Sequence, residues 1–253
     1  MIWDLQKASI WKRASAYLFD MIVACILVVG FAFGISKIVN YDSHNEKLDS
    51  YYSHYENMYG IEFEISEEEY QALTPDELER YNAAYDALVS DEEALNEYSL
   101  VVNLTLITIS LGVLLGIIAV EFVLPLIFGN GQTLGKKIFG LGVIKTNGVK
   151  INNVSLFIRT VLGKYTIETM VPVYIVIMIY FNTVGLTGTV ILGLLALLEL
   201  LVVALTKTHS AIHDLLADTV VIDISSQMIF DTENDLIEYK KKLAAEKAAR
   251  ADY

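Results

Sequence analysis

The chain contains 253 residues, of which 54% are hydrophobic and 19% are charged, whereas a soluble domain typically has about 25% charged residues. Its net charge of −13 would suit a soluble acidic protein, but residues 41–98 hold 17 acidic side chains against Lys47 and Arg80, so the rest of the chain is slightly basic. The single cysteine, Cys25, excludes a disulfide framework and a cysteine-based metal site.

Four stretches are long and apolar enough to cross a membrane as helices, which takes about 20 mostly apolar residues. They are residues 14–39, 100–128, 160–181 and 185–205. A secretory signal is the alternative for the first stretch, but its apolar run exceeds the roughly 7–15 residues of a signal sequence, which favours a retained anchor. The sequence therefore predicts an all-α membrane protein with four transmembrane helices.

The distribution of Lys and Arg predicts the orientation, because these residues are enriched in cytoplasmic loops. They occur before the first span, between the second and third, and after the fourth, at Lys7, Lys12, Arg13, Lys136, Lys137, Lys145, Lys150, Lys207 and residues 240–242. With four spans all these segments share one side, so both termini are expected in the cytoplasm. The expected divisions are the N-terminus and first span (1–39), an extracytoplasmic acidic insertion (40–99), the other three spans with a cytoplasmic loop (100–223), and a charged cytoplasmic tail (224–253).

The acidic insertion contains three matches to the capping box that starts helices. These are Ser66 with Glu69, Thr74 with Glu77, and Ser90 with Glu93, and they predict helices at 66–72, at 75–89, and from about 91 into the second span. Nine of the fifteen tyrosines fall in residues 41–98. Tyrosines and acids together could form a protein-binding surface or an ion-attracting mouth; a solvated cap that packs its tyrosines internally is the simpler alternative.

The loop after the second span is predicted to contain a small cytoplasmic β-hairpin. Asn147-Gly148 is a strong hairpin turn signal, and it lies between apolar residues 141–146 and 149–151. Residues 219–224 could add a third strand from a distant part of the chain. Residues 154–164 are expected to form an interfacial helix, with Arg159 and Lys164 reaching toward the membrane surface.

The remaining motifs do not predict a cofactor. His209 and His213 stand four residues apart and precede Asp214, but no third metal ligand is evident, so no metal is expected. The glycine-rich residues 129–137 lack the spacing of a phosphate-binding loop, and no nucleic-acid partner is expected. The tail from Asp231 is predicted to be a charged helix.

Each predicted span carries one carboxylate, although a charged group at the centre of a membrane helix costs about 2.5–3.5 kcal/mol on insertion scales. The four are Asp20, Glu121, Glu168 and Glu199. With a rise of 1.5 Å per residue, all four are expected roughly 9–12 Å from the cytoplasmic boundary. They could form a proton- or cation-binding cluster, be neutralised by Arg13, Arg159, Lys164 or the histidines, or bridge helices without transporting anything.

Arg13 and Asp20 are seven residues apart on one helix, or about 10 Å. That distance is too long for a direct ion pair. Each is therefore expected to find its partner on another helix or another subunit.

Three motifs in order resemble the RDD (Arg-Asp-Asp) family of membrane proteins. The first is Arg13 with Asp20, the second is residues 131–148 followed by Arg159, and the third is His213-Asp214-Leu-Leu-Ala-Asp-Thr219. Asp218 stands where the family pattern often has Gly, which puts a tight turn there in doubt. The resemblance implies a bacterial membrane protein and a defining trio of Arg13, Asp20 and Asp214. Some members are linked to cation/proton exchange and others to complexes with membrane proteases.

Two functions are expected from these observations. The first is a transporter or ion pathway in the bacterial plasma membrane that uses Asp20, Glu121 and Glu199 to bind a cation or proton; four helices are few for a carrier, so it would act as an oligomer. The second is a non-enzymatic subunit or regulator of a larger membrane complex that binds through the acidic insertion and its helix faces. An enzyme is not expected, because no nucleophile–base pair is visible.

Overall fold

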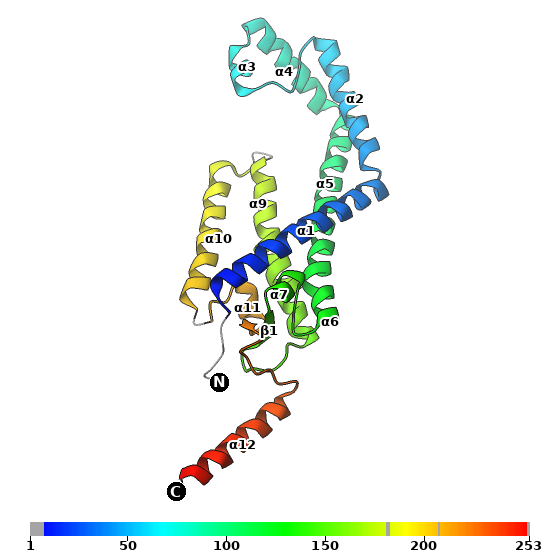
Figure 1. Ribbon diagram of the computed structural model, residues 1–253. Helices are drawn as coiled ribbons and strands as arrows, with labels where there is room; N and C mark the ends of the chain where they lie inside the picture. The colour runs from blue at the N-terminus through cyan, green and yellow to red at the C-terminus, as the bar shows by residue number, and fades with distance from the viewer. Residues whose placement is uncertain (1–7, 181–182, 207, 252–253) are drawn as a thin grey trace. The chain divides into compact units, whose positions relative to one another are not determined.

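The protein, seen in a computed structural model, is described for residues 8–180, 183–206 and 208–251 (Figure 1). It divides into two compact units: a main unit of residues 1–28 and 113–253, and an insertion unit of residues 29–112. Among the described residues, four helices are long and apolar enough to cross a membrane, namely Ile10–Ile38, Glu92–Phe128, Asn153–Ile179 and Gly185–Leu205. The all-α membrane fold with four spans is thereby confirmed; residue 181, the expected end of the third span, lies outside the described residues.

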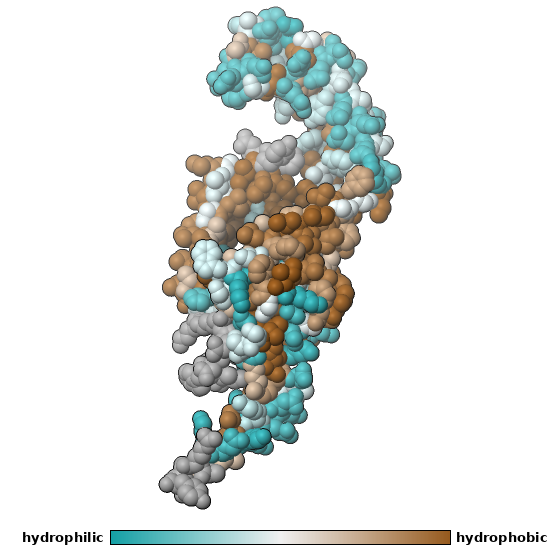
Figure 2. Space-filling view, in the orientation of Figure 1, coloured by the Kyte–Doolittle hydropathy of each residue, from teal (hydrophilic) through white to brown (hydrophobic). Residues whose placement is uncertain are grey.

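The first and fourth spans are regular α-helices, α1 (Ile10–Ile38) and α10 (Gly185–Leu205). Neither contains a proline or a charged run that would end it early. Hydrophobic side chains cover the outside of α1, α9 and α10 in Figure 2. These helices have little protein around them, so lipid takes the place of a protein core on their outer faces.

The second and third spans each change helix type. The second consists of α5 (Glu92–Ile118), a short π-helix η1 (Ala119–Val123) and α6 (Leu124–Phe128). The third consists of α8 (Asn153–Phe157), a long π-helix η2 (Ile158–Met170) and α9 (Val171–Tyr180). Residues 154–164, expected to form an interfacial helix, are helical and continue directly into the third span.

The small sheet joins distant parts of the chain. Strand β1 (Leu141–Lys145) pairs antiparallel with β2 (Thr219–Asp223), with Leu141 opposite Asp223 and Lys145 opposite Thr219. The Asn147-Gly148 turn forms, since the Lys145 N–H donates to the Val149 carbonyl. Its second arm, however, makes only isolated bridges, from Lys150 to Ile144 and from Val149 to Phe230. The predicted hairpin is thus corrected to a two-stranded sheet in which residues 219–223 supply the partner strand.

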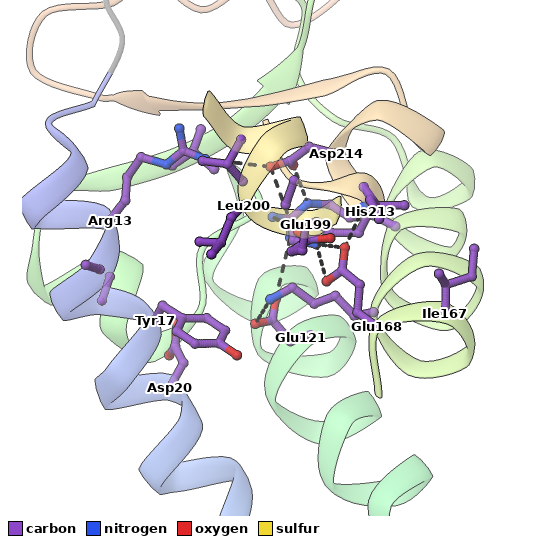
Figure 3. Close-up of a pocket in the computed structure, with 18 of the residues that line it drawn as sticks. Arg13, Tyr17, Asp20, Glu121, Ile167, Glu168, Glu199, Leu200, His213 and Asp214 are labelled. Carbon is purple, nitrogen blue, oxygen red and sulfur yellow. Dashed lines mark hydrogen bonds and ion pairs between the residues drawn. The ribbon is translucent and has the colours of Figure 1, made fainter. Parts of the chain in front are cut away.

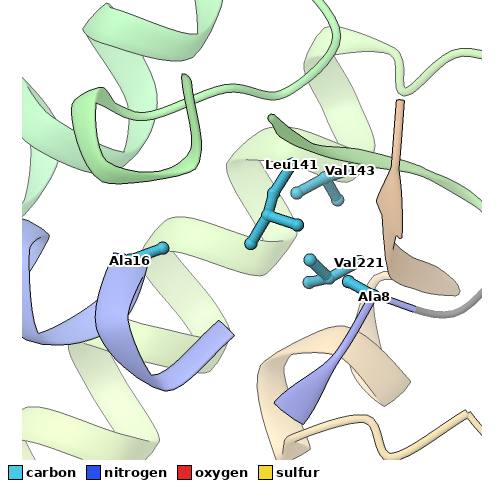
Figure 4. Packing of buried hydrophobic residues seen from close by; sticks show 5 residues of the cluster. All are labelled: Ala8, Ala16, Leu141, Val143 and Val221. Atoms are coloured by element: carbon cyan, nitrogen blue, oxygen red, sulfur yellow. The ribbon is translucent and has the colours of Figure 1, made fainter. Parts of the chain in front are cut away.

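One of the two buried sides of this sheet packs against the start of the first span. Ala8 and Ala16 contact Leu141, Val143 and Val221, all less than a tenth exposed (Figure 4). The helices α7 (Leu134–Ile138) and α11 (Ile212–Leu216) lie next to β1 and β2, respectively. The charged helix α12 (Glu233–Ala251) follows the sheet. This contact anchors α1 to the elements that carry the charged side chains described below.

The insertion unit is helical, as expected. Helix α3 (Glu67–Ala72) begins at Ser66, and α4 (Pro75–Ser90) begins at Thr74. Both capping boxes are complete, because each hydroxyl accepts from the third helical N–H and the glutamate accepts from the cap N–H. The third predicted box is wrong: Asp91, rather than Ser90, caps α5 by accepting from the N–H groups of Glu93 and Ala94.

A fourth helix of the insertion unit, α2 (Tyr41–Tyr59), is not predicted by the capping motifs. It starts after Asn40 and stops before Gly60, which both adopt left-handed backbone conformations. Helix α2 packs against α4. Its aromatic rings join an edge-to-face series in which Tyr52 contacts Phe63, and Phe63 contacts Tyr81. Part of the tyrosine content is therefore used internally, which supports the simpler alternative of a self-packed helical cap.

Candidate functional site

Asp20 of α1 fixes the loop that follows the second span. Its carboxylate accepts hydrogen bonds from the Thr133 hydroxyl at 2.5 Å and from the Gly135 backbone N–H at 2.7 Å. Thr133 is also the N-cap of α7, so an anion at this point meets the N–H groups that a helix leaves unpaired. A Cβ on Gly135 would lie 2.3 Å from the Ala16 carbonyl oxygen, so only glycine permits this approach.

Glu121, in π-helix η1, is surrounded by three cations. Its carboxylate lies 3.4 Å from Lys136 Nζ and 3.5 Å from an Arg159 guanidinium nitrogen, and it accepts a shorter hydrogen bond from Lys164. The side chain is only 9% exposed, so these charges compensate the buried carboxylate. Lys136 lies in the loop, and burial lowers its pKa to about 8 against the opposing attraction of Glu121.

Arg159 and Asp214 form the central ion pair. Arg159 Nε donates to Asp214 Oδ1 at 2.9 Å, and both side chains are almost completely buried. The Thr219 hydroxyl donates to the same oxygen at 2.9 Å. Burial alone would raise the pKa of Asp214, but electrostatic attraction to Arg159 and His213, together with the hydrogen bonds from Arg159 and Thr219, outweighs it and holds this pKa well below its usual range. Arg13 lies 3.9 Å from the other oxygen, Oδ2.

His213 connects the central pair to Glu168. An Arg159 guanidinium nitrogen lies 3.0 Å from His213 Nε2, while His213 Nδ1 lies 2.7 Å from the Glu168 carboxylate. Because a guanidinium can only donate, Nε2 accepts and Nδ1–H donates to Glu168. Burial lowers the pKa of His213, although the Asp214 carboxylate raises it. The neutral tautomer with its proton on Nδ1 therefore fits these contacts.

The π-helix η2 brings the third span's charges to one side. Arg159 and Glu168 are nine positions apart, about 2.5 turns of an α-helix, which would place them on opposite faces. In η2 the hydrogen bonds run to the fifth residue back, so nine residues make about two turns. Arg159 and Glu168 then both face His213. Gly163 lies between them on this face, where a Cβ would come within 2.5 Å of His213 Cβ.

All of these groups line one cavity of about 800 Å³ in the main unit (Figure 3). In this view Arg13, Tyr17 and Asp20 extend from α1 on one side, and Glu168, His213 and Asp214 lie on the other. The charged lining residues among those described are four cations, Arg13, Lys136, Arg159 and Lys164, and five carboxylates, Asp20, Glu121, Glu168, Glu199 and Asp214. With His213 neutral, the wall carries one excess negative charge.

Two carboxylate positions are left incompletely satisfied. Glu199 of α10 is half-buried and forms no ion pair with any side chain in the described part of the protein; the backbone of Ile212 is its hydrogen-bonding neighbour. Asp214 Oδ2 is buried without a hydrogen-bond partner in residues 8–180, 183–206 and 208–251. The excess charge of the cavity is therefore located near Glu199 and Asp214.

Comparison with known families agrees with this arrangement. The model of the RDD family matches residues 7–218, which include every cavity residue except Val221. The chain belongs to the RDD family. Neither the curated proteins nor the solved structures gave a match.

Arg13, Asp20 and Asp214, the trio expected from the family resemblance, lie in two parts of the same cavity. Arg13 and Asp214 face each other, while Asp20 holds the Thr133 loop. The departure at Asp218 leaves the turn intact, because Asp218 adopts a φ of 52° and accepts a hydrogen bond from Thr146. Aspartate tolerates this left-handed conformation better than most residues.

All eight candidate residues from the sequence line the cavity: Arg13, Asp20, Glu121, Arg159, Glu168, Glu199, His213 and Asp214. Sequence reasoning missed Lys136 and Thr133, whose only signal was their place in the loop motif. His209 does not share a helical face with His213, because it precedes α11 with a φ of 50°. Among the described residues no cluster of three or more potential metal ligands occurs.

Proposed function

We propose that this RDD protein is a non-enzymatic transport protein of the bacterial plasma membrane that exchanges a cation for protons. The observation that carries the proposal is the excess carboxylate in a membrane-embedded cavity. Intramembrane acids are costly and are found where ions or protons bind. Glu199 combines half-burial, a place on a membrane-spanning helix, and the absence of a cationic partner among the described residues.

The contacts of the other acids fit a structural role. Asp20 is satisfied by Thr133 and Gly135, and Glu121 by three cations. A carboxylate that is already compensated gains little from an additional cation. We therefore assign the exchangeable charge to Glu199 rather than to Asp20 or Glu121.

One excess negative charge also explains why cation and proton would compete. A proton on Glu199 neutralises the cavity, and so does one monovalent cation beside it. Binding both would leave a net positive charge in a medium where uncompensated charge is expensive. His213 and Glu168, which are hydrogen-bonded to each other, line the same cavity. The Glu168 carboxylate offers the proton a neighbouring acceptor.

Proton exchange can be measured directly with purified protein in liposomes that hold a pH gradient. With wild-type protein, adding sodium, potassium or hexyltrimethylammonium outside should release protons from the liposome interior, as followed by a pH-sensitive dye. Glu199→Gln should abolish the response, whereas Glu238→Gln, the same change on the exposed helix α12, should leave it intact. A wild-type response no greater than that of Glu199→Gln for every cation would refute the proposal.

The orientation is part of the proposal: both termini lie in the cytoplasm, and the insertion unit lies outside. The support is the basic loop containing Lys136 and the acidic insertion. In a Cys25→Ser background, a membrane-impermeant maleimide should label Ser50→Cys in intact cells but not Ser226→Cys; both positions are exposed. Labelling of Ser226→Cys alone would reverse the orientation.

Because four helices are few for a carrier, we also propose that the protein acts as an oligomer.

A second candidate function is that of a subunit in a larger membrane complex. The supporting observation is a hollow of about 370 Å³ in the insertion unit, whose lining includes the exposed side chains of Tyr85, Leu95 and Tyr98. Exposed aromatic and aliphatic residues around a hollow are typical of protein-binding sites. A photo-crosslinking amino acid at Tyr85 should capture another membrane protein; capture of this chain alone would count against a hetero-complex.

A further inference from the structure

The cavity is much larger than a proton or a metal ion requires. At about 800 Å³ it falls in the range of pockets that enclose drug-sized organic molecules, about 300–1,000 Å³. Filled with water alone it would hold roughly 27 molecules at about 30 Å³ each. Much of its wall is apolar and gives water no hydrogen-bond partner: Ile10, Ala14, Ile167, Pro172, Leu192, Leu195, Ala196, Leu200 and Val203. The size and this wall favour an organic occupant.

The polar end of the same cavity fits a single positive charge. Glu199 lacks a cationic partner among the described residues, and the buried Asp214 Oδ2 lacks a hydrogen-bond donor there. Arg13 lies 3.9 Å from this oxygen, which is too far for a hydrogen bond, and His213 Nε2, 3.5 Å away, carries no proton in the neutral tautomer assigned above. An anion would face this excess negative charge, whereas a monovalent cation would neutralise it.

Tyr17 adds an aromatic surface suited to an organic cation. It lines the cavity, and Lys164 Nζ already lies 5.9 Å from the centre of its ring. The face of an aromatic ring attracts ammonium groups, and quaternary ammonium ligands are commonly recognised in this way. Carboxylates together with an aromatic ring therefore favour an ammonium-like head over a strongly hydrated metal ion.

The cavity is also accessible from the membrane. Tyr17 of α1 and Leu200 of α10 line it, and their side chains are 59% and 68% exposed, respectively. Both helices are membrane-spanning in length and composition, so these exposed side chains face lipid. A molecule dissolved in the bilayer can reach the cavity between them without crossing the charged network.

We propose that this cavity binds an amphiphilic organic monocation, with its cationic head beside Tyr17, Glu199 and Asp214 and its apolar body along Leu192, Leu195 and Leu200 of α10. The inference rests on the proposed function in that it names the class of cation exchanged. It also makes a separate claim about binding, which holds whether or not transport occurs.

Binding can be measured with radiolabelled tetraphenylphosphonium and the full-length protein in lipid nanodiscs. Unlabelled hexyltrimethylammonium should displace the probe. Hexyl sulfate, which has the same chain length and the opposite charge, should not displace it, and sodium should do so poorly. Equal displacement by hexyl sulfate and hexyltrimethylammonium would overturn the inference, because it would show that only the apolar tail is recognised.

Three variants locate the site. Glu199→Gln should weaken probe binding by about tenfold or more, and Tyr17→Leu should weaken it severalfold. Leu195→Trp, which fills the apolar end and keeps every charge, should also weaken it, whereas Glu238→Gln should bind as wild type does. Thermal unfolding of each variant identifies those that fail to fold. Wild-type affinity in folded Glu199→Gln and Leu195→Trp would overturn the assignment.

Failure of this inference can be distinguished from failure of the proposed function. Glu199-dependent proton release by sodium or potassium without tetraphenylphosphonium binding would overturn the organic-cation site and leave exchange standing. Site-specific probe binding without proton release by any cation would overturn exchange and leave the binding site standing.

Discussion

The main unit should depend strongly on Arg159 for its stability. This side chain is 2% exposed, donates to Asp214 at 2.9 Å and lies 3.5 Å from Glu121. Removing one partner of a buried ion pair leaves the other charge uncompensated and costs about 3–5 kcal/mol. We expect Arg159→Met to lower the free energy of unfolding by about this amount, because Asp214 would retain only the more distant Arg13 as a permanent cation.

A double-mutant cycle measures the interaction energy between Arg159 and Asp214 apart from their other contacts. Arg159→Met and Asp214→Leu each leave one buried charge, whereas the double variant leaves neither. The double variant should therefore lose less stability than the sum of the single variants, by about 1–3 kcal/mol. Unfolding by sodium dodecyl sulfate in mixed micelles, followed by circular dichroism, gives the four free energies required.

The matched control is an ion pair outside the cavity. Lys12 contacts Asp223 at 2.7 Å, but the lysine side chain is 48% exposed, and exposed ion pairs contribute little to stability. Lys12→Met should therefore lower stability much less than Arg159→Met. Equal losses in the two variants, or strict additivity in the cycle, would refute the idea that this buried network stabilises the main unit.

Three further predictions concern the same network. Gly135→Ala should lower stability by about 1–3 kcal/mol because its Cβ would overlap the Ala16 carbonyl. Gly193→Ala, which has open space around the added Cβ, should not lower it, and thermal melting compares the stabilities of the two variants. Burial lowers the pKa of His213, so below about pH 6.5 the unfolded state binds more protons than the folded state. The free energy of unfolding should therefore fall on acidification, and His213→Gln should flatten this pH dependence in unfolding titrations. Lys136, whose pKa falls to about 8, should make stability rise between pH 8 and about 10.4; a slope that persists in Lys136→Met would contradict this.

The sequence predicted features that depend on nearby residues. The four spans follow from the length of apolar runs, which the bilayer sets directly. The caps at Ser66 and Thr74 involve residues three positions apart, so a short window contains all the information. The third cap failed because Ser90 and Asp91 are adjacent, and either can supply an N-cap oxygen.

Features that depend on distant residues were harder to predict. The Asn147-Gly148 turn formed, yet β1 took β2 as its main partner because residues 219–223 could pair along its whole length. Nothing in the sequence shows that Lys136 would enter the cavity beside Glu121. The eight candidate residues nevertheless all line the cavity, since a charge in an apolar span needs a partner wherever the chain provides one; their role there stays a prediction.

The helix type explains why the pairing itself could not be predicted. An α-helical reading places Arg159 and Glu168 on opposite faces, and only the π-helix η2 turns both toward His213. Glu121 also lies in a π-helix, where three cations surround it. Such segments are less favourable than α-helix and often occur at functional sites, so their presence here means that the ion pairs outweigh this cost. Glu199 stands in a regular α-helix without such a partner among the described residues, and for this reason we propose it, rather than the paired acids, as the site of charge exchange.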